Sequence, residues 1–134
     1  MADLDAVHAR LKSLLGRHRE GLAVTADGPG GMKLEVPGLE GKPWGYAAGT
    51  RLGKRYVSLY LMGVYASPGI VAGLSPELRA RMQGKSCFNF TTIDEGLFEE
   101  VSGVIRRSMS GFDEVARRID RERSKTPKGR APAV

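Results

Sequence analysis

"RYVSLYLM", residues Arg55–Met62, carries the clearest strand pattern in the chain and decides the fold. Side chains of a β-strand point alternately to its two faces. One face would carry Val57, Leu59 and Leu61, and the other Tyr56, Ser58, Tyr60 and Met62. Both faces are largely apolar or aromatic, which is typical of a central strand that is covered at least partly on each side.

The segment before this strand predicts three more strands joined by short turns. Apolar residues alternate at 22–26 and 32–36, and "DGPGG" at 27–31 is typical of a tight turn, so these two runs form a hairpin. A third alternating run, Trp44–Ala48, leads into "TRLGK", where Gly53 suits a turn position with positive φ. Such short connections favour antiparallel pairing.

The segment after it predicts two short helices and a fifth strand. "SPGIVAG" at 67–73 and "SPELRARM" at 75–82 are both helical patterns, and Ser75 is placed to cap the second helix. In "RMQGKSCFNF", Arg81–Phe90, we expect Gly84 to end that helix and a strand to follow. One face of the strand would hold Ser86, Phe88 and Phe90, and the other Lys85, Cys87 and Asn89.

Two amphipathic helices flank the strands. The first spans about Asp3–Arg19, where apolar residues recur mostly at spacings of three and four. The second begins at a capping box from Thr92 to Glu95, keeps its apolar face to Phe112, and is followed by a last helical piece at 113–120. Because both apolar faces must be buried, we predict an α+β two-layer sandwich, with an antiparallel sheet of about five strands and the N- and C-terminal helices on one face.

Positive charge is concentrated at the C-terminus. Residues 117–134 hold seven of the 21 Lys and Arg side chains but only two of the 15 Asp and Glu side chains, in a chain of net charge +6. A chain of 134 residues suits one domain. We predict a single domain at 1–120 and a basic tail at 121–134 that is disordered from about Ser124. Such a tail can contact polyanions weakly, although most basic runs are only solvated ends.

Cysteine usage and hydropathy predict the compartment. The single cysteine cannot form an internal disulfide, which favours a reducing, cytoplasmic environment. The N-terminal "MADLDAVHARLKSLL" carries two early aspartates and no long apolar run, unlike a secretory signal. No window approaches the roughly 18 apolar residues of a membrane span. We therefore expect a cytoplasmic protein that does not bind a membrane.

The Gly-Lys-Ser triplet at 84–86 resembles part of a phosphate-binding loop. A P-loop has the pattern G-x-x-x-x-G-K-[ST] and connects a strand to a helix, so that backbone amides surround the phosphates. Here Arg79 stands where the first glycine is required, and the triplet leads from a helix into a strand. Both requirements fail, so we predict no nucleotide hydrolysis at this triplet.

Cys87 is the other candidate for chemistry in this stretch. A nucleophilic cysteine needs a base or a helix N-terminus that lowers its pKa. The two histidines, His8 and His18, both belong to the first helix, and their spacing is not that of a helical metal pair. A half-buried strand thiol is the commoner role. We predict no catalytic residues and no enzymatic activity, and an enzyme using Cys87 stays a weaker alternative.

Acidic residues gather in the first two turns of the second long helix. Glu95 and Glu99 are one turn apart and could share a metal ion, whereas acids at a helix N-terminus also complement the helix dipole. We favour the structural role. A metal site formed by Glu95 and Glu99 belongs to the alternative interpretation only.

The candidate binding surface is the polar and aromatic face of the predicted sheet, which would carry Tyr46, Lys54, Tyr60, Lys85 and Asn89. It would hold more aromatic and thioether surface than a free sheet face normally exposes. Cover by residues 68–82 of the same chain is the simpler interpretation, and a partner subunit or a ligand are the alternatives. For the ligand, we predict a pocket lined by Tyr60, Lys85 and Asn89.

Two motifs resemble a known family. "KRYVSLYLMGVY" at 54–65 and "LSPELRARMQGKSCFNF" at 74–90 are similar to the YdhG-like domain of unknown function, a group of small bacterial proteins, and the resemblance covers roughly residues 20–112. It implies a compact α+β domain. Some members are described as frataxin-like intracellular iron chaperones, which would use an acidic first helix. Here that helix carries cations that would repel Fe²⁺: Arg10, Lys12, Arg17 and Arg19.

These observations predict a cytosolic, non-enzymatic binding or interaction domain. Its partner would be an unknown small molecule or protein, and a homodimer through the polar and aromatic face is one possibility. We expect no cofactor. The alternative is an intracellular iron chaperone of the frataxin-like kind, with iron held by Glu95 and Glu99.

Overall fold

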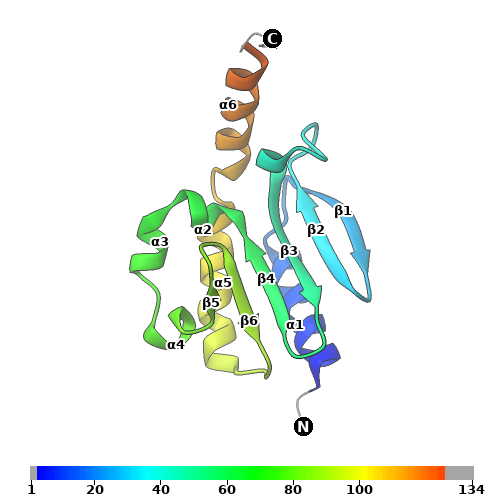
Figure 1. The fold of residues 1–134 in the computed structure, drawn as a ribbon, viewed down its shortest axis with the longest axis vertical. Coiled ribbons are helices and arrows are strands. Elements are labelled where there is room, and N and C mark those ends of the chain that lie inside the picture. Colours follow the sequence, from blue (N-terminus) through cyan, green and yellow to red (C-terminus); the bar gives the residue numbers. More distant parts are fainter. Residues whose placement is uncertain (1–2, 126–134) are drawn as a thin grey trace.

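The computed structural model describes residues 3–125, which form one antiparallel sheet and a layer of helices. The six strands of the described sheet lie in the order β1-β2-β3-β4-β6-β5 (Figure 1). Every neighbouring pair is antiparallel. The strands are β1 (Ala23–Gly28), β2 (Gly31–Glu35), β3 (Tyr46–Leu52), β4 (Val57–Leu61), β5 (Met82–Gln83) and β6 (Cys87–Phe90).

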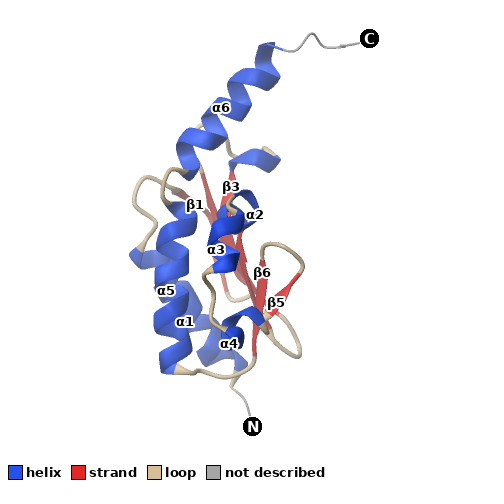
Figure 2. Cartoon of the chain, turned by 90° about the vertical axis from the view of Figure 1, so that its left-hand side faces the viewer, coloured by secondary structure: helices blue, strands red, loops and turns tan. Residues whose placement is uncertain are grey.

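The helices cover one face of this sheet. Helices α1 and α5 lie on one side of the strands, and on the other side Figure 2 shows a short helix only at the upper end of the sheet, next to β3. This arrangement confirms the predicted α+β fold. The helical elements are α1 (Leu4–Arg17), η1 (Pro43–Gly45), α2 (Met62–Ala66), α3 (Pro68–Ala72), α4 (Pro76–Arg79), α5 (Glu95–Met109) and α6 (Phe112–Lys125).

The core lies between the helix layer and the inner face of the sheet. Val57, Leu59 and Leu61 of β4 are completely buried there, as the alternation predicted. Phe90 of β6 meets Phe98 of α5 edge to face, with ring centroids 5.4 Å apart. The burial of these apolar side chains is the main stabilising contribution to the fold. The apolar face of α1 belongs to the same core, and its buried residues are Val7, Leu11, Leu14 and Leu15.

Helix α6 extends beyond the sheet and uses a separate apolar cluster. Ala116 of α6 is buried against Val36 and Leu39, and Trp44 and Phe112 pack around them. The chain bends between α5 and α6 at Gly111, whose φ is +74°. Phe112 therefore belongs to α6. The sequence pattern had placed it on the apolar face of α5, and that prediction is wrong.

The C-terminal boundary also differs from the prediction. Helix α6 continues through Lys125, beyond residue 120, where we expected the domain to end. It includes Ser124, where disorder was expected to begin. The remainder of the predicted tail, 126–134, lies outside the described residues.

The segment 68–82 does not cover the outer sheet face, so that expectation is wrong. Helices α2, α3 and α4 contact α5, on the same side as the main core. Leu78 of α4 is 1% exposed and belongs to the main apolar cluster. Because Leu78 is buried in this cluster, residues 68–82 pack on the side of α5 and do not cover the outer face of β4.

Three local predictions about turns and caps are wrong. The N-cap of α5 is Asp94, which accepts a hydrogen bond from the Leu97 amide at 3.1 Å, so no capping box forms from Thr92. Gly84 has φ +78° but lies in the turn between β5 and β6, a strand pair that the sequence did not indicate. Gly53 does not have positive φ. Glycine suits this position because a Cβ would lie only 2.8 Å from the Tyr56 carbonyl oxygen.

Candidate binding surfaces

The uncovered face of the sheet brings Tyr60 and Asn89 close together. Tyr60 of β4 lies between Gly49 of β3 and Cys87 of β6 in the strand register. Asn89 lies two residues along β6 on the same face, because it pairs with Ser58. The structure thus joins two of the three residues that the sequence suggested for a binding pocket.

Asn89 is already engaged in a polar network on this face. Its side-chain oxygen accepts a hydrogen bond from Ser58 at 2.8 Å, and its amide donates to Gln83 at 3.0 Å. The Cys87 thiol is 3.5 Å from the same oxygen. These contacts fix the amide orientation, so Asn89 presents a preorganised polar edge beside Tyr60.

Tyr46 lies flat on the sheet next to Tyr60. Its hydroxyl occupies the space that a side chain at Gly49 would need, and the Lys33 ammonium is 5.4 Å from its ring centroid. Burial, reinforced by Tyr60, Cys87 and Glu35, raises the pKa of Tyr46 to about 12. The Tyr46 phenol is therefore neutral at physiological pH.

Glu35 contributes little negative charge to the surface of this face. It is 3% exposed, accepts hydrogen bonds from Thr25 and from the Gly41 amide at 2.7 and 2.8 Å, and lies 3.8 Å from the Lys33 ammonium. Burial raises the pKa of this carboxyl, but the two hydrogen bonds and Lys33 outweigh that effect, and the pKa is lowered. Glu35 is therefore ionised and neutralised inside the protein.

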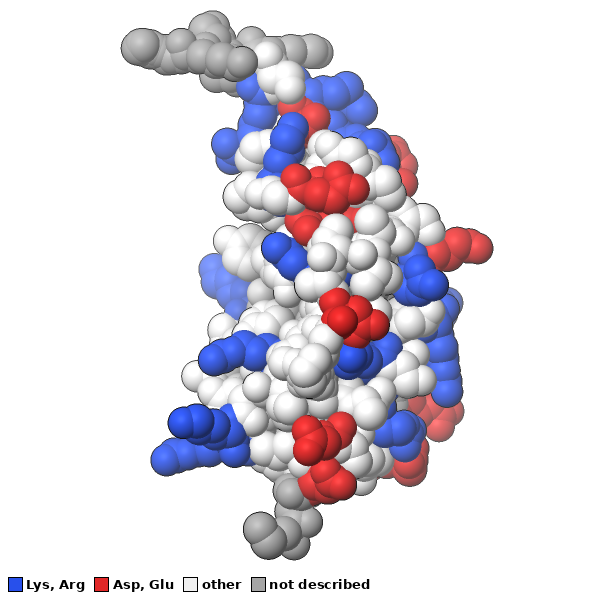
Figure 3. Space-filling view, turned by 90° about the vertical axis from the view of Figure 1, so that its right-hand side faces the viewer, with Lys and Arg blue, Asp and Glu red and all other residues white. Residues whose placement is uncertain are grey.

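Cations line a hollow at the β3–β4 hairpin, next to the same face. This hairpin hollow has a volume of about 270 Å³ and is lined by Arg51, Gly53, Lys54, Arg55, Tyr56 and Ser58. Within residues 3–125, no carboxylate forms an ion pair with its three cations. In Figure 3 the outer sheet face is seen edge-on at the left, and the charged side chains at that margin are Lys and Arg.

Lys85 lies apart from Tyr60 and Asn89. It follows Gly84 in the β5–β6 turn, and its ammonium is 5.5 Å from the ring centroid of Tyr65. It lines a different hollow, of about 650 Å³, with Tyr65, Val71 and Met82. The predicted grouping is not formed because residues 84–86 belong to a hairpin turn and not to the strand itself.

The Gly-Lys-Ser triplet and Cys87 show no arrangement for catalysis. The triplet joins two strands, which agrees with the prediction that it is not a P-loop. Burial raises the pKa of the Cys87 thiol, and a hydrogen bond involving Ser58 only partly opposes this effect. A thiol with a raised pKa is a poor nucleophile at neutral pH.

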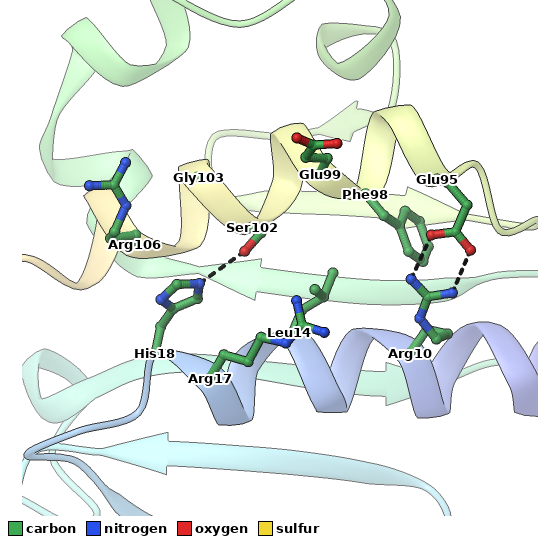
Figure 4. A pocket seen from close by; sticks show the side chains of 10 residues that line it. All are labelled: Arg10, Leu14, Arg17, His18, Glu95, Phe98, Glu99, Ser102, Gly103 and Arg106. Atoms are coloured by element: carbon green, nitrogen blue, oxygen red, sulfur yellow. Dashed lines mark hydrogen bonds and ion pairs between the residues drawn. The ribbon is translucent and has the colours of Figure 1, made fainter.

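The acidic cluster of α5 is used mainly for structural contacts. Arg10 of α1 donates to both carboxylate oxygens of Glu95 at 2.6 and 2.7 Å, and this hydrogen bonding lowers the pKa of Glu95. Glu100 accepts from the amide and hydroxyl of Ser75 at 2.8 and 2.5 Å, which fixes the N-cap of α4. Glu99 points in a different direction from Glu95 (Figure 4).

These positions do not favour iron binding by Glu95 and Glu99. Both oxygens of Glu95 already bind a guanidinium, which a metal ion would have to displace. Among residues 3–125, no group of three or more His, Cys, Asp or Glu side chains is arranged to hold a metal ion. In the same range, no helix is long and apolar enough to cross a membrane.

Comparison with known proteins finds no matching family model, no similar curated protein and no similar solved structure. The resemblance to the YdhG-like domain therefore stays a prediction.

Sequence reasoning missed the cations of the hairpin hollow. The signal was present in "TRLGKRY" at 50–56, where three cations surround a turn. Arg51 belongs to β3 and pairs with Ser58 of β4, whereas Arg55 lies in the turn between the two strands, and only the folded hairpin shows that both line one hollow. The net charge indicated the C-terminal tail instead, because seven Lys and Arg side chains lie in residues 117–134.

Proposed function

We propose that this chain is a binding domain, not an enzyme, whose uncovered sheet face binds single-stranded nucleic acid. The observation that carries this proposal is the hairpin hollow. Its three cations have no acidic partner in the described part of the chain, and they lie beside tyrosines on the sheet face opposite α1 and α5. Such cations attract phosphates, and aromatic rings stack with bases.

The positions of the tyrosine rings support a nucleic-acid strand that lies along β4. Tyr56 is 40% exposed at the hairpin hollow, and Tyr60 lies four residues further along the same face. An extended chain rises about 3.3 Å per residue, so the backbone positions of Tyr56 and Tyr60 are about 13 Å apart. An extended single strand could place its phosphates over Arg51, Lys54 and Arg55 and its bases over the tyrosines.

Charge argues against a second copy of the chain on this face. A two-fold interface would bring the same surface of both protomers together. Lys33 and the three cations of the hairpin hollow would then face one another, and like charges at close range repel. A polyanion has the complementary charge.

Fluorescence anisotropy with a labelled oligouridylate or oligothymidylate at low salt tests the proposal. We expect Tyr60→Ala, and the double variant Arg51→Gln with Arg55→Gln, each to weaken binding on the order of tenfold. Arg107→Gln with Arg118→Gln is the matched control, because it removes the same charge from α5 and α6. We expect the control to change affinity much less.

Two outcomes would overturn the proposal. In the first, the control pair weakens binding as much as the hairpin pair, so that only overall charge matters. In the second, poly-glutamate binds as tightly as the oligonucleotide and Tyr60→Ala has no effect, so that the face recognises acidic protein segments without any contribution from base stacking.

A further inference from the structure

A second concave surface lies on the other side of the molecule, between α1 and α5. This helix groove has a volume of about 440 Å³, within the range of small-molecule sites. In Figure 4 the two helices run in the same direction along it. The lining residues are Arg10, Leu14, Arg17, His18, Glu95, Phe98, Glu99, Ser102, Gly103 and Arg106.

The two ends of the helix groove differ in charge. At one end Arg10 and Glu95 form a two-pronged ion pair that neutralises both groups. At the other end the Nε2 atom of His18 lies 3.0 Å from the hydroxyl oxygen of Ser102. Arg106 lines the groove one turn further along α5, and its guanidinium points away from α1 in Figure 4.

The electrostatic environment at His18 is positive. Burial lowers the pKa of this imidazole, and the charges of Arg106 and Arg17 lower it further. Within residues 3–125, neither guanidinium forms an ion pair. Glu99 lines the groove but directs its carboxylate away from His18 (Figure 4).

Carboxylates occur nearby but do not pair with these two arginines. Glu20 and Asp113 line an adjoining hollow of about 340 Å³, which shares Arg17, His18 and Arg106 with the helix groove. No ion pair joins either carboxylate to either guanidinium in the described residues. Neither guanidinium is thus held by a carboxylate, and an anion between α1 and α5 would draw the Arg17 side chain, now directed toward Leu14, and the Arg106 side chain, now directed away from α1, inward (Figure 4).

Gly103 is a second and independent feature of the helix groove. It lies inside α5, where glycine is less favourable than alanine. A Cβ at this position would meet only the Arg107 guanidinium, at 3.6 Å, which is ordinary van der Waals contact. Packing therefore does not require glycine here, and its lack of a side chain leaves space beside Ser102.

We infer that the helix groove binds a small organic anion, a carboxylate or phosphate group on a short apolar body. The anion pairs with Arg17 and Arg106 and contacts Ser102 and His18. The body lies over Gly103, toward Leu14 and Phe98. This site is on the helix layer, opposite the sheet face, so it does not depend on the proposed nucleic-acid binding.

Binding is tested by titrating the protein with benzoate and with phenyl phosphate, followed by two-dimensional NMR, with benzyl alcohol as the uncharged probe. We expect saturable shifts of the His18, Ser102 and Gly103 amides with at least one anion in the millimolar range or below, and none with the alcohol. The two anions decide between a carboxylate and a phosphate group. Saturable shifts confined to the hairpin hollow, or no saturation with either anion, would overturn the inference.

Variants separate binding from folding. Gly103→Ala should raise the melting temperature, since alanine favours the helix, and yet weaken anion binding. Gly103→Leu should fill the groove and weaken binding about tenfold or more, as should Arg106→Gln. Gly16→Ala is the matched control, because it adds a methyl group to α1 in open space. Unchanged affinity in folded Gly103→Ala and Arg106→Gln proteins would contradict the proposed site.

Discussion

At the scale of single residues, the buried histidine of α1 shows how one side chain connects two layers. His8 is 3% exposed, and its Nε2 atom lies 2.8 Å from the hydroxyl oxygen of Thr50 in β3. The Thr50 hydroxyl oxygen also accepts a hydrogen bond from the Met32 amide at 3.1 Å. This contact ties helix to sheet in a place where the sequence pattern predicted only an apolar stripe.

The stability of the protein should therefore depend on pH through this histidine. Burial lowers the pKa of His8, Lys12 lowers it further, and Asp27 and Asp5 oppose the shift. Because the folded state binds the proton less tightly than the unfolded state, stability is complete above the unfolded pKa of about 6.5 and falls as pH decreases toward the lowered value. Urea denaturation at several pH values measures this loss.

Substitution separates the contributions of the two histidines, since the pKa of His18 is lowered as well. In His8→Gln we expect a lower stability at neutral pH and a smaller further loss on acidification. His18→Gln should remove only its own part of the pH dependence. A wild-type protein whose stability rises on going from neutral pH to about pH 5 would contradict the argument.

At the scale of elements, close backbone contact determines how α2 lies on α5. A Cβ at Gly63 would collide with the Ser108 carbonyl oxygen and lie 2.6 Å from the Ser108 hydroxyl oxygen. That hydroxyl is buried and has no hydrogen-bond partner in the described structure. The small residue in "LMGVY" allows the chain to turn directly from β4 into α2 against α5.

Gly63→Ala should destabilise the protein by about 1–3 kcal/mol, because the atoms that must move belong to the backbone of a helix. Gly69→Ala is the control: it adds the same methyl group to α3, where nothing lies within 4 Å. Thermal denaturation of both variants measures the difference. Equal melting temperatures would show that α2 and α5 can separate without cost.

Helix α6 is an element that we expect to open on its own. Its apolar cluster is separate from the main core, and Asp120 anchors it by accepting hydrogen bonds from Lys42 at 2.6 Å and from the Trp44 indole at 3.1 Å. In Asp120→Ala, amide hydrogen exchange should become faster in α6 and stay unchanged in α1 and β4. Faster exchange in every element would instead show that α6 is part of a single cooperative unit.

At the scale of the whole molecule, the charges form two distinct surfaces on opposite sides of one sheet. The hairpin hollow belongs to the outer sheet face, and the helix groove belongs to the helix layer. Lys and Arg side chains are also numerous around α6, at the top of Figure 3. A net charge of +6 therefore does not by itself identify which surface meets a polyanion.

Salt dependence separates the sheet face from the C-terminal end. If three or four cations of the face neutralise phosphates, the logarithm of affinity should fall with the logarithm of salt concentration with a slope of about −2 to −3. A chain ending at Lys125 should keep most of this slope. Loss of both affinity and slope in the shortened chain would place the binding in residues 126–134.

The sequence by itself determined the classes of the elements, because their signals are local. Alternation identified β4 and its two faces, and the spacing of apolar residues identified α1 and α5. The two-residue strand β5 was missed, since two residues show no period. The start of α2 was missed as well, because Met62 continues the strand alternation.

Only the tertiary structure decided which surfaces stay open and which charges meet. Arg10 and Glu95 are 85 residues apart in the chain, and no local pattern predicts their ion pair. The burial of Leu78 against α5 decided that residues 68–82 join the helix layer and leave Tyr60 uncovered. Such choices depend on which distant apolar surfaces bury one another, and that competition is settled by packing across the whole chain.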